Sequence, residues 1–186
     1  MSEAGRPGRY QRSANGLLGA MVITVVAVVG FVGFRSLFSD EPEVRPEAVD
    51  YLEIVGLAQD ADIRPVYPQE LPEGWIATRA EVVPDERPAF DLALLTDDEL
   101  FVGVVWSAES LDTLLAERVD DEDVEDADPL TVRGSVARTW EGYADPGGDR
   151  AYAAEVGKHT VLVYGSASDE ELRGIVASLT TAPLSR

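Results

Sequence analysis

Cysteine is absent from this 186-residue chain, and histidine occurs once, as His159. Without thiols the chain cannot form disulfides, zinc–thiolate sites, a cysteine nucleophile or the lipid-modified cysteine of a bacterial lipoprotein. A single histidine needs an orienting partner and a nucleophile before it can act as a general base. The Gly-x-Ser-x-Gly elbow that would supply a nucleophilic serine is missing too. The sequence therefore predicts no catalytic, cofactor-binding or metal-binding residues, and we expect His159 to be a surface residue at the start of a strand.

Basic residues are scarce after residue 39, where 34 acidic side chains face only 11 basic ones. Such a charge repels phosphates, which argues against nucleic acid and against an anionic membrane surface as partners. A cationic partner or metal ions would fit this charge, but it can equally serve solubility alone.

The densest acidic run, from Asp120 to Asp128, does not fit a calcium loop. Aligned with such a loop, Asp126 stands where glycine is needed and Val132 where glutamate is needed. We therefore expect this run to be a solvated loop, which is typical of like charges in sequence. A loose site for a hard cation in this run stays open.

The longest hydrophobic run extends from Gly16 to Phe34, 19 residues without an ionisable side chain. A helix of this length covers about 28 Å, close to the roughly 30 Å hydrocarbon core of a bilayer. Three arginines lie within the residues before the run and only Arg35 follows it directly. By the positive-inside rule this asymmetry places the N-terminus in the cytoplasm. We expect a single-pass protein of the cell membrane with its C-terminal domain outside.

A cleaved signal peptide is the alternative to this anchor. The apolar region of a signal peptide runs about 7 to 15 residues, whereas this run is longer and contains its own best cleavage candidate, Val28–Gly30. We therefore divide the chain into a cytoplasmic N-terminus (1–15), a transmembrane helix (16–34), an acidic linker (35–46) and an extracytoplasmic domain (47–186). Cleavage of the anchor at some stage stays open.

Hydrophobic periodicity after residue 46 predicts an α+β domain, a mostly antiparallel sheet with packed helices. Helices are expected over 47–59, after Ser110 and after Ser168, where Ser168 and Glu171 fit a capping box. Strands are expected over residues 76–83, 90–96, 100–106, 130–133, 135–143, 150–156 and 159–165. The ranges 100–106 and 159–165 are apolar on both faces, so we expect them to be central strands covered on both sides.

Four aromatic residues on or beside these strands form a candidate ligand groove: Trp75, Trp106, Trp140 and Tyr143. Aromatic side chains can line a hydrophobic groove for a lipid or a partner peptide. Core packing explains them equally well, because aromatic residues on strands normally face the core. The sequence leaves both alternatives open.

Five segments, taken in their order along the chain, resemble a known family. They are Arg9–Ser13, Val49–Tyr51, Leu71–Trp75 (Leu-Pro-Glu-Gly-Trp), Thr139–Tyr143 (Thr-Trp-Glu-Gly-Tyr) and Gly165–Leu172. Together they look like the actinobacterial domain of unknown function 4245, and the resemblance covers nearly the whole chain. It implies a single-pass membrane protein with an outer domain of unknown function, and it brings no catalytic residues.

These features favour a noncatalytic binding or scaffolding module of the cell envelope, with the membrane and an envelope protein or lipid as partners. Two alternatives stay open: a carrier or sensor of a lipid or small apolar ligand, and an envelope hydrolase that uses carboxylates. The carrier predicts a deep cavity between sheet and helix, and the hydrolase predicts a pocket with two acids of raised pKa. The oligomeric state is not predicted.

Overall fold

The computed structural model describes residue 28 and the ranges 46–120 and 124–184. The chain divides into two units, residues 1–45 and 46–186, and the description that follows concerns the second unit. The predicted transmembrane helix and linker lie outside the described residues, apart from residues 28 and 46. In the described part of the chain, no helix combines the length and the apolar character that a membrane crossing requires.

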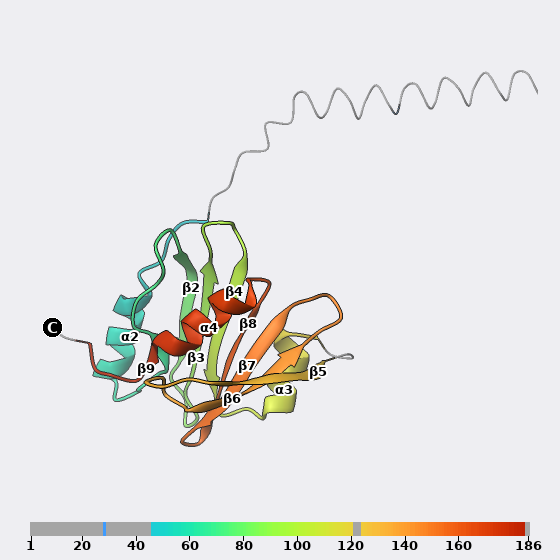
Figure 1. The fold of residues 1–186 in the computed structure, drawn as a ribbon. Coiled ribbons are helices and arrows are strands. Elements are labelled where there is room, and N and C mark those ends of the chain that lie inside the picture. The colour runs from blue at the N-terminus through green and yellow to red at the C-terminus, as the bar shows by residue number, and fades with distance from the viewer. Residues whose placement is uncertain (1–27, 29–45, 121–123, 185–186) are drawn as a thin grey trace, which may run out of the picture. The chain divides into compact units, whose positions relative to one another are not determined.

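A seven-stranded antiparallel sheet forms the body of the domain (Figure 1), with the strand order β2-β3-β4-β8-β7-β6-β5. Its strands are β2 (Ile76–Val83), β3 (Ala89–Leu95), β4 (Phe101–Ser107), β5 (Glu125–Thr131), β6 (Thr139–Ala144), β7 (Arg150–Val156) and β8 (His159–Gly165). The first three form one meander, and the last four form a second meander that returns from the far edge to the centre. The two meanders join where β4 pairs with β8.

Within the described residues, three helices and a short strand pair complete the domain. The helices are α2 (Tyr51–Asp60), α3 (Leu111–Arg118) and α4 (Asp169–Ser178), and the strand pair joins β1 (Tyr67–Pro68) to β9 (Leu179–Thr180). In Figure 1, α4 lies across one face of the sheet and α2 lies beside β2. The prediction of an α+β domain with a mostly antiparallel sheet and packed helices is therefore confirmed.

The larger hydrophobic core lies between the sheet and the helices α2 and α4. Alternate strand residues face it, because side chains two apart share one face of a strand. Its members without solvent exposure include Val55, Leu92, Leu94, Val102, Val104, Trp140, Val161, Val163, Leu172 and Val176. Burying this many branched and aromatic side chains supplies the main stabilisation of a chain that has no cysteine.

A smaller core lies on the opposite face of the sheet, under α3. Leu114 and Leu115 of α3 pack there with Val105, Leu162 and Tyr164. Strands β4 and β8 therefore bury both faces, as their sequence predicts. With 8 residues, α3 is only about 12 Å long, so it covers only part of this face.

The helix starts follow their capping residues. In α4, the Ser168 side chain accepts from the Glu171 N–H while the Glu171 carboxylate accepts from the Ser168 N–H, so the predicted capping box is confirmed. The predicted start of the first helix is too early. Asp50 accepts from the N–H groups of Leu52 and Glu53 and so starts α2 at Tyr51 rather than at residue 47.

The sequence prediction is least accurate for β5 and β6. It expected strands over 130–133 and 135–143, but β5 begins at Glu125, inside the run expected to be a loop, and β6 begins at Thr139. Edge strands keep charged side chains in water, so acidic residues are compatible with β5. The first acidic residues of that run, 121–123, lie outside the described residues.

A β-bulge in β2 changes which side chains share a face. The register shifts between Ala77 and Arg79, so Ala77 and Ala80 both pack in or against the larger core. Ile76 pairs with Leu95 instead. The sequence of this strand predicts that Ile76, Thr78, Ala80 and Val82 share one face, and the bulge interrupts this alternation near Thr78.

Candidate functional site

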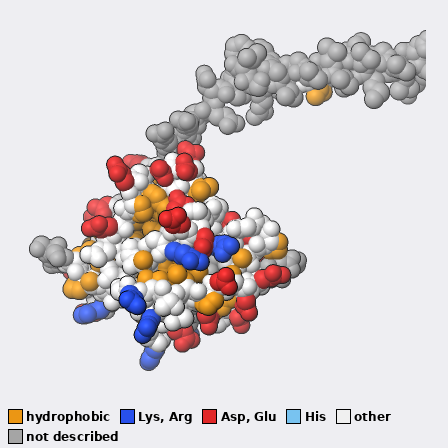
Figure 2. Space-filling view, in the orientation of Figure 1, with side chains coloured by type: hydrophobic (Ala, Val, Ile, Leu, Met, Phe, Trp, Pro, Cys, Tyr) orange, Lys and Arg blue, Asp and Glu red, His pale blue; other side chains and the backbone are white. Residues whose placement is uncertain are grey.

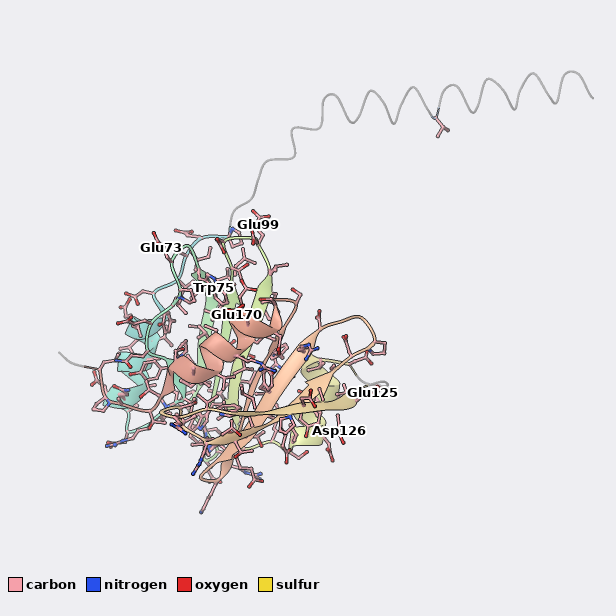
Figure 3. All side chains as sticks on the ribbon, viewed as in Figure 1. Glu73, Trp75, Glu99, Glu125, Asp126 and Glu170 are labelled. Atoms are coloured by element: carbon pink, nitrogen blue, oxygen red, sulfur yellow. The ribbon has the colours of Figure 1, made fainter. Side chains whose placement is uncertain are left out.

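The three tryptophans of the predicted groove lie in the larger core. Trp75, Trp106 and Trp140 are 9 %, 6 % and 0 % exposed, respectively. Trp75, labelled in Figure 3, lies directly before β2, at the end of the sheet near which Glu73 and Glu99 also lie. Core packing, which the sequence left open as an alternative, therefore describes the tryptophans.

Tyr143 lies on the opposite face from the tryptophans, packed against the smaller core. Its hydroxyl donates to Oε2 of Glu141 at 2.9 Å. Burial and this hydrogen bond raise the pKa of Tyr143 to about 12. The structure therefore does not bring the four residues of the predicted groove together.

His159 is half-buried rather than a fully exposed surface residue. Its ring stacks on Trp106 with the ring centroids 4.0 Å apart, and Nε2 lies 3.2 Å from the carbonyl oxygen of Pro88. These contacts join His159, at the start of β8, to Trp106 of the larger core and to Pro88, which directly precedes β3.

On the face that carries α3, the half formed by β2, β3 and part of β4 has exposed side chains, among them Glu81 and Val83, and we call it the open half. The strand registers place Ile76, Leu95 and Phe101 side by side across this half. All three are half-buried, and Ile76 and Leu95 belong to neither hydrophobic core. We call these three residues the apolar row.

A carboxylate links α3 to the open half of the sheet. Asp91 on β3 accepts from Arg79 of β2 at 2.8 Å through Oδ1 and lies 2.9 Å from Nη1 of Arg118 through Oδ2. Burial lowers the pKa of the Arg118 guanidinium, but Asp91 and the Tyr164 hydroxyl outweigh this effect and raise it. We call Arg79, Asp91 and Arg118 the ion bridge, because it holds the end of α3 against the outer strands.

Tyr164 lies between the apolar row and the ion bridge. Its ring meets Phe101 edge-on, with the centroids 5.6 Å apart and the planes at 65°. A Cβ on Gly103 would overlap this ring, so only glycine allows the close approach. Burial raises the pKa of the Tyr164 hydroxyl, although Arg118 opposes the shift.

Two open clefts flank the connection from β4 to α3 and share Ala108 and Glu109. The cleft beside the open half has about 570 Å³ and is lined by five carboxylates and two arginines: Glu81, Asp85, Asp91, Glu109, Glu117, Arg87 and Arg118. The other has about 630 Å³ and includes Glu109, Glu141, Glu155 and Lys158. Together the clefts present seven carboxylates and three cationic side chains. They are best suited to hold cationic groups.

A metal site needs several ligating side chains close together. Among the described residues, no group of three or more His, Cys, Asp or Glu is placed to hold a metal ion. Burial and the neighbouring Asp145 raise the pKa of Asp149, but this residue belongs to the β6–β7 turn and lines neither cleft.

The face that carries α4 holds a second charged cluster. The buried Tyr152 donates its hydroxyl to Asp169 at the start of α4 and accepts from Nε of Arg173 at 3.0 Å. Arg173 also pairs with Asp169 at 2.9 Å, and Arg150 lies 3.7 Å from the same carboxylate. Figure 2 shows cationic side chains over α4 near the centre of this face and acidic ones around them. Each polar group here has an internal partner, so the cluster ties α4 to β7.

The fold is an α+β domain in which helices cover both faces of one antiparallel sheet. The chain belongs to the family described as "Protein of unknown function (DUF4245)", whose model matches residues 9–179. The resemblance seen in the sequence is thereby confirmed. A comparison with curated proteins gives no match.

One solved structure with a similar chain is titled "Crystal structure of MucB in complex with MucA(peri)". The similarity covers 64 % of this chain and 37 % of that chain, at 12 % identity and a TM-score of 0.34. The chain thus spans little more than a third of the length of that protein.

Proposed function

We propose that this chain is a single-pass membrane protein whose residues 47–186 form a noncatalytic binding or scaffolding module outside the cytoplasm. The hydrophobic run Gly16–Phe34 and the arginines that flank it support the anchor and its orientation. Protease added to intact cells should remove the domain, and full protection would contradict the topology.

The open half of the α3 face is the observation that carries the binding function. It combines a half-buried apolar row at one end of β2 and β3 with the ion bridge and, at the other end of these strands, the acidic cleft. Protein interfaces likewise combine apolar and charged groups on one surface. Because five carboxylates and two arginines line this cleft, the partner is an envelope protein that presents cationic side chains to the cleft and an apolar one to the apolar row.

A protein partner fits better than a lipid. The lipid-carrier alternative needs a cavity between the sheet and a helix, but buried side chains that include the three tryptophans pack the region between the sheet and α4. The two clefts lie outside that core, and charged side chains line much of both.

In vivo photo-crosslinking tests this proposal in the host cell. A photoreactive residue at Ile76 should give a discrete protein adduct, and one at Leu57 of α2, which is 61 % exposed, should not. The Ile76 adduct should be lost when both Glu81→Arg and Asp85→Arg are introduced. The same charge change made away from the cleft, by Glu53→Arg and Glu70→Arg, should leave the adduct intact. Equal adducts from Ile76 and Leu57 would contradict the proposed surface. Equal loss of the Ile76 adduct in both charge-reversed double variants would contradict it too.

A further inference from the structure

The segment after α4 folds back onto α2 and is held there by one glutamine. Gln59 donates through Nε2 to the carbonyl oxygen of Ala182 at 3.0 Å and accepts through Oε1 from the Leu184 N–H at 2.9 Å. The side-chain amide thus pairs with the passing backbone as a peptide group of a neighbouring strand would. No sequence pattern indicated this role.

Two further contacts fix the same segment. Tyr67 donates its hydroxyl to the carbonyl oxygen of Ala182 at 2.7 Å, so this oxygen accepts two hydrogen bonds. The Leu184 side chain packs against the larger core and lies beside Gly56 of α2, 3.7 Å from the position a Cβ would take there.

The other end of α2 is attached to the β2 and β1 strands. Just before the helix, Val49 donates its N–H to the carbonyl oxygen of Ala77 at 2.8 Å. At the first helical position, the buried Tyr51 hydroxyl donates to the carbonyl oxygen of Pro68 at 2.9 Å. Pro68 pairs in turn with Leu179 of β9. Strand β1 is therefore attached both to α2 and to the segment 179–184.

We infer that residues 179–184 form a clasp on α2, and that the helix and the clasp open as one unit while the seven-stranded sheet stays intact. Elements that add few side chains to the core open more readily than its central strands, and α2 buries only Tyr51, Val55 and Ala58. A pull on the residues directly before α2 would act through Val49, and it would loosen the helix and with it the clasp. Release of the clasp would in turn loosen α2. This inference does not depend on the proposed binding function.

Hydrogen exchange of the full-length protein in detergent micelles, followed by mass spectrometry, tests the clasp. The variant Gln59→Ala removes both side-chain bonds, and Gln69→Ala is its matched control. Gln69 is exposed, and its hydrogen bond runs through its backbone N–H to Ser178. We expect peptides from α2 and from 179–184 to exchange about tenfold faster in Gln59→Ala, the effect of losing one to two net hydrogen bonds. Peptides from β4 and β8 should keep their rates, and Gln69→Ala should behave as the wild type.

A second variant, in which the chain ends after Thr180, should accelerate exchange in α2 at least as much. Unchanged exchange of α2 in both variants would overturn the inference. An equal acceleration in β4 and β8 would overturn it too, because the clasp would then be part of the global unfolding unit.

Discussion

Replacing Gly103 by alanine tests the packing that separates the apolar row from the ion bridge. The new Cβ would overlap the ring of Tyr164, which is 8 % exposed and therefore cannot swing freely into solvent. To make room, the ring must give up part of its edge-on contact with Phe101 and its hydrogen bond with Arg118.

The expected change in the free energy of unfolding follows from these lost contacts. Overfilling a packed site costs about 1–3 kcal/mol, and the aromatic contact contributes about 0.5–1.5 kcal/mol. A smaller term of about 0.4–1 kcal/mol has the opposite sign, because alanine restricts the unfolded chain more than glycine does. We expect Gly103→Ala to lower the free energy of unfolding by about 2 kcal/mol, within the range of these contributions.

Urea unfolding followed by the fluorescence of the buried tryptophans measures this change. Gly174→Ala is the control, because Gly174 lies in α4 with no atom within 4 Å of the new Cβ. It should stabilise the domain by about 0.5–1 kcal/mol. In a Tyr164→Ala background, Gly103→Ala should cost almost nothing, since the overlapping ring is gone. A cost below about 0.5 kcal/mol in the wild-type background, or an undiminished cost beside Tyr164→Ala, would refute the reasoning.

Three further predictions concern pH and helix capping. Burial raises the pKa of Tyr51 from 10.0 to about 12. The neutral hydroxyl therefore stabilises the fold below about pH 10, and this contribution is lost between about pH 10 and 12. Over that range the free energy of unfolding should fall less steeply with pH in Tyr51→Phe than in the wild type. Burial alone would raise the pKa of Asp169, but the Tyr152 hydrogen bond and Arg173 lower it below 3.8. The ionised carboxylate therefore stabilises the fold above about pH 4, and this contribution is lost as the pH falls further. Acid titrations of Asp169→Asn should lack that part of the loss in the free energy of unfolding. Removing the α4 capping box with Ser168→Ala should lower the free energy of unfolding by about 1 kcal/mol, whereas Ser178→Ala at the other end of α4 should cost less.

Local signals explain which elements could be predicted from the sequence. The strands 150–156 and 159–165 are confirmed to the residue, because Gly157 supplies the positive φ of +69° that their two-residue turn requires. The helix after Ser168 is confirmed by its capping box, whose two hydrogen bonds lie within four residues. Both signals depend on residues close together in the chain, so they can be recognised in a single sequence.

The features that define the candidate site depend on long-range pairing. The ion bridge joins Arg118 to Asp91 and Arg79, which lie on three different elements. The apolar row exists because the bulge near Thr78 turns Ile76 toward Leu95, and a bulge leaves no periodic signal in the sequence. The tryptophans of the predicted groove are conspicuous in the sequence, yet strand alternation directs Trp106 and Trp140 into the core.

The most direct test of the binding function is native mass spectrometry of the outer domain, released gently from the membranes of its own host. We predict that the wild type and Leu57→Arg retain a protein partner, whereas Leu95→Arg, which places a positive charge in the apolar row, is released without it. Tryptophan fluorescence of both variants should match the wild type, as the check that each is folded. A bare wild-type domain, a bound mass of lipid size, or a partner that Leu95→Arg retains would contradict the account.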